Sequence, residues 1–111
     1  MRAHSIITLI LLLLASVHAS AAYLTTTQLF QYLEEDMRGG EEYGHGFASG
    51  YAIGLADAVD GTIVCIPKGT SVKQVKLVLF NFLKAHPERW ASAAEISVVK
   101  ALQDAWPCKQ Q

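Results

Sequence analysis

The sequence has few of the residues that usually mark redox, metal-binding or nucleic-acid-binding proteins. It contains only two cysteines, Cys65 and Cys108, and no C-x-x-C pair, which excludes a thioredoxin-type motif. Two cysteines with the scattered histidines His45 and His86 are too few for a zinc site, so we expect no metal. Charged residues make up 17% of the chain without a basic cluster, so we expect no nucleic-acid binding.

A nucleophile–base arrangement is also missing. The serines of the mature chain fall at expected helix starts or on helix surfaces, and neither His45 nor His86 lies in a catalytic motif. The glycines recur at helical spacing and do not form a phosphate-binding loop. We therefore expect no catalytic residues and no cofactor, and a binding function in place of an enzymatic one.

A long hydrophobic run occurs only at the start of the chain. A basic start precedes the run 6–14, and small residues with A-x-A-like spacing follow it, which is typical of a secretory signal peptide. The run is shorter than the roughly 20 residues of a membrane span. We predict a signal peptide at 1–21, cleaved after Ala19 or Ala21, and one small domain at 22–111 in an oxidising compartment. The alternative is an uncleaved anchor.

The mature chain has four stretches with the three- and four-residue hydrophobic spacing of amphipathic helices. Ser71 with Gln74, and Ser92 with Glu95, fit the capping-box pattern at the starts of the last two. Pro87 separates these two helices, which we expect to fold back as a hairpin. The fold class is therefore expected to be all-α, a small bundle of about four helices. The expected helices lie at 27–36, 41–60, 72–85 and 93–105.

Three glycines of the second helix, Gly46, Gly50 and Gly54, lie four residues apart. Because glycine in a helix is ~1 kcal/mol less favourable than alanine, this stripe predicts the close approach of another helix. The apolar arcs of the last two helices are wide, which indicates burial on two sides, by the glycine-rich helix or by a second subunit. The acidic run 34–36 is expected to face solvent.

The two cysteines flank the predicted hairpin, so the end of the chain returns to the hairpin's start. We predict a disulfide between Cys65 and Cys108. Closing a loop of roughly 40 residues would stabilise the domain by ~4 kcal/mol through the entropy of the unfolded chain.

The mature chain contains four segments in this order: G-Y-A-I-G-L-A-D-A (50–58), C-I-P-K-G (65–69), F-L-K-A-H-P-E-R (82–89) and A-L-Q-D-A-W-P-C (101–108). In order and spacing they resemble the Tai/Rap family of immunity proteins, which protect bacteria from type VI secretion amidase toxins. The resemblance implies a small all-helical periplasmic protein, often a homodimer. Such a protein binds a peptidoglycan amidase and blocks its active-site cleft without chemistry of its own.

We predict the toxin contact at the tip of the hairpin, at His86, Glu88, Arg89 and Trp90. Tryptophan and arginine are common interface anchors, but the alternative is that Trp90 packs onto the hairpin itself. The competing function is an Hde-like acid-stress chaperone of the periplasm, also small, helical and disulfide-bonded. Protonation of its 10 Asp and Glu residues would then expose apolar surface in acid.

Overall fold

The computed structural model describes residues 22–39 and 43–109, apart from the side chain of His45. Within these residues the only β-pairings are isolated bridges, so the predicted all-α bundle is confirmed. The predicted signal peptide, residues 1–21, lies outside the described residues. The helices are α2 (Thr26–Met37), α3 (Tyr43–Val59), α4 (Val72–Ala85) and α5 (Ala94–Ala105), with a 3-10 helix η1 (Pro87–Arg89) between α4 and α5.

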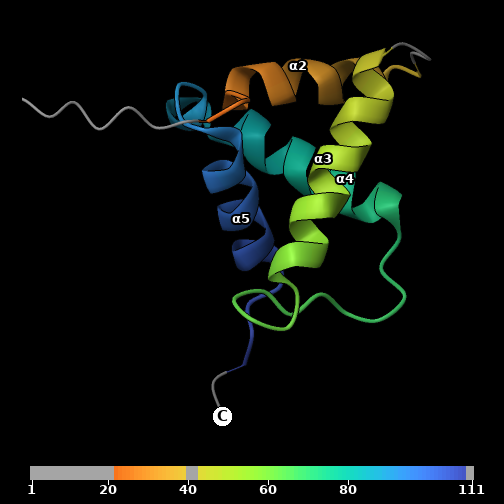
Figure 1. The fold of residues 1–111 in the computed structure, drawn as a ribbon, viewed down its shortest axis with the longest axis vertical. Helices are drawn as coiled ribbons and strands as arrows, with labels where there is room; N and C mark the ends of the chain where they lie inside the picture. Colours follow the sequence, from red (N-terminus) through yellow and green to blue (C-terminus); the bar gives the residue numbers. More distant parts are fainter. Residues whose placement is uncertain (1–21, 40–42, 110–111) are drawn as a thin grey trace, which may run out of the picture.

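The four α-helices surround one core. Figure 1 shows α2 lying across one end, α3 and α5 extending away from it, and α4 crossing behind α3. The loop between α3 and α4 closes the opposite end, where the C-terminal segment also lies. Every helix contributes apolar side chains to the core, and each buried leucine stabilises the fold by roughly 1.5–3 kcal/mol. Fully buried members of the core are Leu29, Leu33, Ala48, Ala52, Val64, Leu79, Leu83, Ala94, Val98 and Leu102.

Local capping sets the starts of α2 and α4. Ser71 Oγ accepts the N–H of Gln74 at 3.2 Å, and Gln74 Oε1 accepts the N–H of Ser71 at 2.7 Å, which confirms the predicted capping box. Thr25 and Gln28 make the same reciprocal pair at the start of α2. These two helices therefore begin where their own sequences dictate.

The predicted capping box at Ser92 and Glu95 is wrong. α5 begins at Ala94 without a side-chain cap, and the N–H of Ala94 donates to the carbonyl oxygen of Leu24 at 3.0 Å. Ser92 Oγ instead donates to the carbonyl oxygen of Arg89 at 2.6 Å. At the start of α5, a main-chain acceptor from the N-terminal segment takes the place of a side-chain cap. A short sequence pattern cannot predict this hydrogen bond, because the acceptor is distant in the sequence.

The expectation that the acidic run 34–36 faces solvent is wrong at Asp36. Its side chain is only 3% exposed, and Oδ2 lies 2.5 Å from Nζ of Lys76 on α4, whose side chain is 13% exposed. A buried carboxylate is tolerated when a cation pairs with it. This ion pair connects the end of α2 to α4.

Gly46, Gly50 and Gly54 do not make the close helix contact predicted for them within the chain. All three are exposed, and a Cβ added at any of them would meet nothing within 4 Å. The close approach is at the buried Gly44, where a Cβ would lie 2.7 Å from Cδ1 of Tyr32 on α2. The spacing identified one face of α3 correctly, but that face points outwards.

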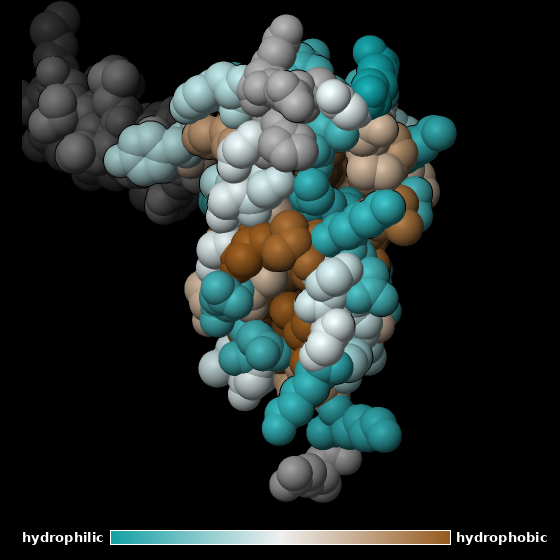
Figure 2. Space-filling view, turned by 90° about the vertical axis from the view of Figure 1, so that its right-hand side faces the viewer, coloured by the Kyte–Doolittle hydropathy of each residue, from teal (hydrophilic) through white to brown (hydrophobic). Residues whose placement is uncertain are grey.

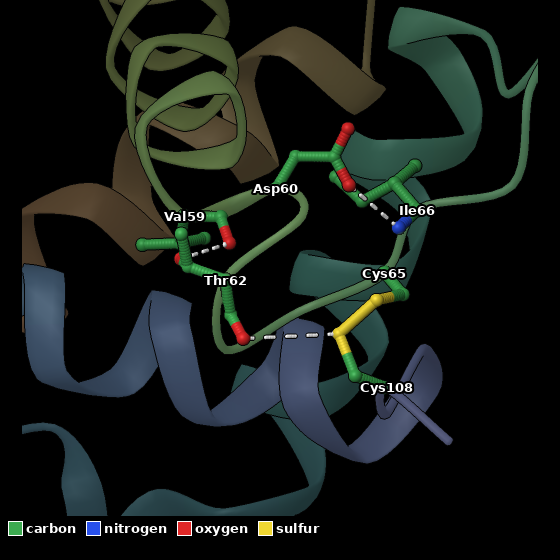
Figure 3. Close-up of a disulfide and its surroundings, with 6 residues drawn as sticks. All are labelled: Val59, Asp60, Thr62, Cys65, Ile66 and Cys108. Carbon is green, nitrogen blue, oxygen red and sulfur yellow. Dashed lines mark hydrogen bonds between the residues drawn. A yellow bond between two sulfur atoms is a disulfide. The ribbon is translucent and has the colours of Figure 1, made fainter. Parts of the chain in front are cut away.

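The disulfide predicted between Cys65 and Cys108 is confirmed (Figure 3). It joins the segment before α4 to the segment after α5, at a sequence separation of 43. The N–H of Cys65 also donates to the carbonyl oxygen of Trp106 at 2.9 Å, and the neighbouring Val64 is fully buried. The C-terminal segment is therefore held against the loop between α3 and α4.

Candidate functional site

The predicted contact site is a tight turn between α4 and α5. His86 ends α4 with a non-helical backbone, and Pro87, which disfavours helical geometry at the residue before it, opens η1. The N–H of Arg89 donates to the carbonyl oxygen of His86 at 3.0 Å, and that of Trp90 donates to Pro87 at 3.1 Å. These bonds fix the backbone of the turn, and with it the directions of its side chains.

Three of the four predicted contact residues form a connected group at the surface. His86 Nδ1 lies 2.7 Å from Glu88 Oε1, with the two side chains 39% and 65% exposed. The hydrogen bond with His86 is the main reason that the pKa of Glu88 is below its usual value. The ring of Phe82 contacts both the His86 ring, at a centroid distance of 4.3 Å, and the Arg89 guanidinium, at 5.7 Å. The tip therefore exposes the negative charge of Glu88 and the positive charge of Arg89 beside the ring of Phe82.

Trp90, the fourth predicted residue, packs against the body of the protein. Its Nε1–H donates to the carbonyl oxygen of Leu83 at 2.8 Å, and its ring stacks on Phe30 at a centroid distance of 5.1 Å. Its carbonyl oxygen accepts the N–H and the hydroxyl of Thr27, at 3.0 and 2.8 Å. Trp90 therefore packs onto the hairpin but is only partly buried, and its contact with a toxin stays a prediction.

A buried group of hydroxyls behind the tip was not predicted. Thr26 Oγ1 lies 2.8 Å from Ser97 Oγ, and Ser92 Oγ lies 3.0 Å from the same atom. Thr26 Oγ1 also lies 3.3 Å from Ser92 Oγ, and the other hydrogen bonds of the group go to main-chain carbonyl oxygens. The group therefore holds the N-terminal segment on the hairpin. The run of threonines at 25–27 was the only sequence signal for this contact.

Beside the tip, the outer face of α5 contains a shallow hollow of about 400 Å³. Arg89 borders it, and its floor is apolar, with Ile96 56% exposed. At its edge Glu95 hydrogen-bonds Tyr51 of α3, whose pKa is raised by burial first and by the charge of Glu95 second. An apolar floor beside charged groups is typical of a protein-binding surface.

The described part of the chain contains no group of three or more His, Cys, Asp or Glu residues that could hold a metal ion. None of the helices described is both long and apolar enough to cross a membrane.

The Rap1a immunity protein family matches residues 20–108, which include all four α-helices and both cysteines of the disulfide. The chain belongs to the Rap1a immunity protein family. As an immunity protein it acts by binding a toxin, so its functional feature is a partner surface. For a Rap1a immunity protein, the exposed tip and the hollow beside it are candidates for that surface. A comparison with curated proteins finds no match.

Proposed function

We propose that this Rap1a family member is a periplasmic immunity protein that inhibits a peptidoglycan amidase delivered by type VI secretion. The observation that carries the proposal is the family match across the whole helical domain, residues 20–108. The signal-peptide pattern of residues 1–21 supports export, and a disulfide is expected in an oxidising compartment. This family match also favours immunity over the Hde-like chaperone function.

The tip of the hairpin is the part of the surface that we propose to enter the amidase's active-site cleft. His86 and Arg89 contact the ring of Phe82, and Glu88 is held by His86, so little side-chain freedom would be lost on binding. Substrate would then be excluded by occupancy of the cleft, without catalysis by the immunity protein. Trp90 supports the turn from behind and is proposed to act through its position only.

The first test is a pull-down of the oxidised domain, residues 22–111, with purified peptidoglycan amidases, scored by peptidoglycan hydrolysis with and without it. Tight binding that stops hydrolysis is expected. Arg89→Ala should weaken binding by about tenfold or more, since arginine is a frequent interface anchor. Lys109→Ala, an exposed cation at the other end of the protein, is the control and should change nothing. Inhibition that is insensitive to Arg89→Ala would contradict the proposal that the hairpin tip binds the amidase. No inhibition of any amidase would contradict the proposal that the target is an amidase.

We further propose that the protein forms a homodimer through the outward glycine face of α3. Gly46, Gly50 and Gly54 are exposed, and the absence of Cβ atoms allows two helix backbones to approach closely. Sedimentation of the wild type should show a dimer, and Gly50→Leu should shift it to a monomer. A monomeric wild type would exclude the dimer.

A further inference from the structure

A second concave surface lies between the end of α3 and the start of α4, away from the hairpin tip. Ile53, Ile66, Val72 and Val75 give it an apolar floor, and its volume is about 300 Å³. Figure 2 shows this side of the molecule, with hydrophobic side chains gathered in the middle of the face between more hydrophilic ones. Val72 is 49% exposed there. The volume is at the lower end of ligand pockets, roughly 300–1,000 Å³, and suits one long side chain.

The edge of this α3–α4 groove is mostly acidic. Asp57 and Asp60 line it together with one cation, Lys68. Asp60 Oδ1 accepts the N–H of Ile66 at 2.8 Å (Figure 3), which leaves its second oxygen for a partner. Among the ion pairs of the described residues, none involves Asp57. An isolated apolar floor would accept any hydrophobic group, but this edge favours a positively charged one.

The loop that forms one wall of the groove is fixed at both ends. The disulfide Cys65–Cys108 holds its start, and the capping box of Ser71 holds its end at α4. Between them, the N–H and the hydroxyl of Thr70 donate to the carbonyl oxygen of Pro67 at 3.2 and 2.7 Å. A preformed wall lowers the entropy lost on binding.

We propose that the α3–α4 groove binds an arginine side chain displayed on the surface of a partner protein. The methylene stem would cover the floor at Ile53 and Val72, and the guanidinium would lie between the carboxylates of Asp57 and Asp60. Arginine suits such a site because its weakly hydrated fork can hydrogen-bond two carboxylate oxygens. The proposal goes beyond inhibition of an amidase by the tip, because it concerns a different surface and holds for any protein partner.

The test is a titration of the oxidised domain with the peptide Ac-Gly-Leu-Arg-Leu-Gly-NH2, followed by the NMR shifts of its backbone amides. Saturable shifts are expected at Ile66, Lys68 and Gly69, with none from a peptide that carries citrulline in place of arginine. Asp57→Asn should weaken binding by about tenfold, as for the loss of a hydrogen bond to a charged group. Lys68→Gln should strengthen it, because a competing cation is removed. Asp104→Asn, at a carboxylate of α5 outside the groove, is the matched control and should have no effect.

Three results would overturn the proposal. Equal shifts with the citrulline peptide, or no saturable shift with either peptide, would show that the groove does not select a cation. Weaker binding of the arginine peptide by Lys68→Gln would show that Lys68 does not compete with the guanidinium for the acidic edge. Groove amides that shift on dilution of the free protein would indicate that a second copy occupies the groove. Because the probe contains no amidase, failure to inhibit amidases would leave these results unchanged.

Discussion

At the scale of single residues, the ion pair between Asp36 and Lys76 is a polar contact that is largely buried between α2 and α4. Both side chains are largely removed from water, at 3% and 13% exposure. The charge of Lys76 is tolerated in this position because Asp36 is present, so losing Asp36 removes the counter-ion of a largely buried cation. The exposed pair between Lys100 and Asp104, at 46% and 48% exposure, has the same chemistry without the burial.

We predict that Asp36→Asn lowers the free energy of unfolding by about 3 kcal/mol, because the buried Lys76 ammonium loses its counter-ion. Asp104→Asn is the matched control and should change it by less than about 0.5 kcal/mol. Urea denaturation at neutral pH measures both. Equal losses in the two variants would show that burial does not set the strength of the Asp36–Lys76 pair.

Tyr51 should make stability depend on alkaline pH. Burial first, and the charge of Glu95 second, raise the pKa of Tyr51 in the folded protein above its ordinary value of 10.0. The unfolded chain releases this proton at lower pH, so the stability that neutral Tyr51 provides is lost as pH rises from 10 through the folded pKa. The advantage of wild type over Tyr51→Phe should therefore shrink across that window in urea denaturation.

At the scale of elements, α3 has two glycine-bearing faces with opposite roles. Gly44 is buried where α2 crosses α3, and a Cβ there would lie 2.6 Å from Glu35 Oε2 and 2.7 Å from Tyr32 Cδ1. Gly50 is exposed, with open space where a Cβ would be. One glycine therefore allows helix packing, while the other only reduces helix propensity within the single chain.

We predict opposite effects for two identical substitutions. Gly44→Ala should destabilise the fold by about 1–3 kcal/mol, because the Tyr32 ring must move. Gly50→Ala should stabilise the single chain by about 0.5–1 kcal/mol through helix propensity. Urea denaturation at low protein concentration measures both. A stabilising Gly44→Ala would contradict the tight packing of α2 on α3.

At the scale of the whole molecule, the disulfide connects the two halves of a small domain. The bond closes a loop whose ends are 43 residues apart, which restricts the unfolded chain. Small domains have total stabilities of roughly 5–15 kcal/mol, so one such bond is a large part of the total. The reduced protein is therefore expected to be only marginally stable.

We predict that replacing both Cys65 and Cys108 by serine lowers the free energy of unfolding by ~4 kcal/mol and markedly lowers Tm. Thermal unfolding with and without reductant measures this effect. Reductant should lower the Tm of the wild type to that of the variant and leave the variant unchanged. A wild-type Tm that does not respond to full reduction would rule out a stabilising role for the bond.

The candidate site could be predicted only in part. The position of the turn followed from Pro87, and His86, Glu88 and Arg89 do lie together on it. The orientation of Trp90 could not be predicted from residues near it in the sequence. Two of its partners, Phe30 and Thr27, belong to α2, and Thr27 precedes it by 63 residues. The α3–α4 groove was not predicted at all, since it forms only where separate segments meet.

The sequence by itself determined where the helices lie and which cysteines pair. These features depend on neighbours within a few residues, such as Ser71 with Gln74, or on there being only two cysteines to join. The tertiary structure decided which face of α3 points inwards, why Asp36 is buried, and how α5 begins at Ala94. Each of these depends on an atom from a distant segment that supplies packing, a counter-charge or a hydrogen-bond acceptor, and hydrophobic spacing along one helix carries no information about that atom.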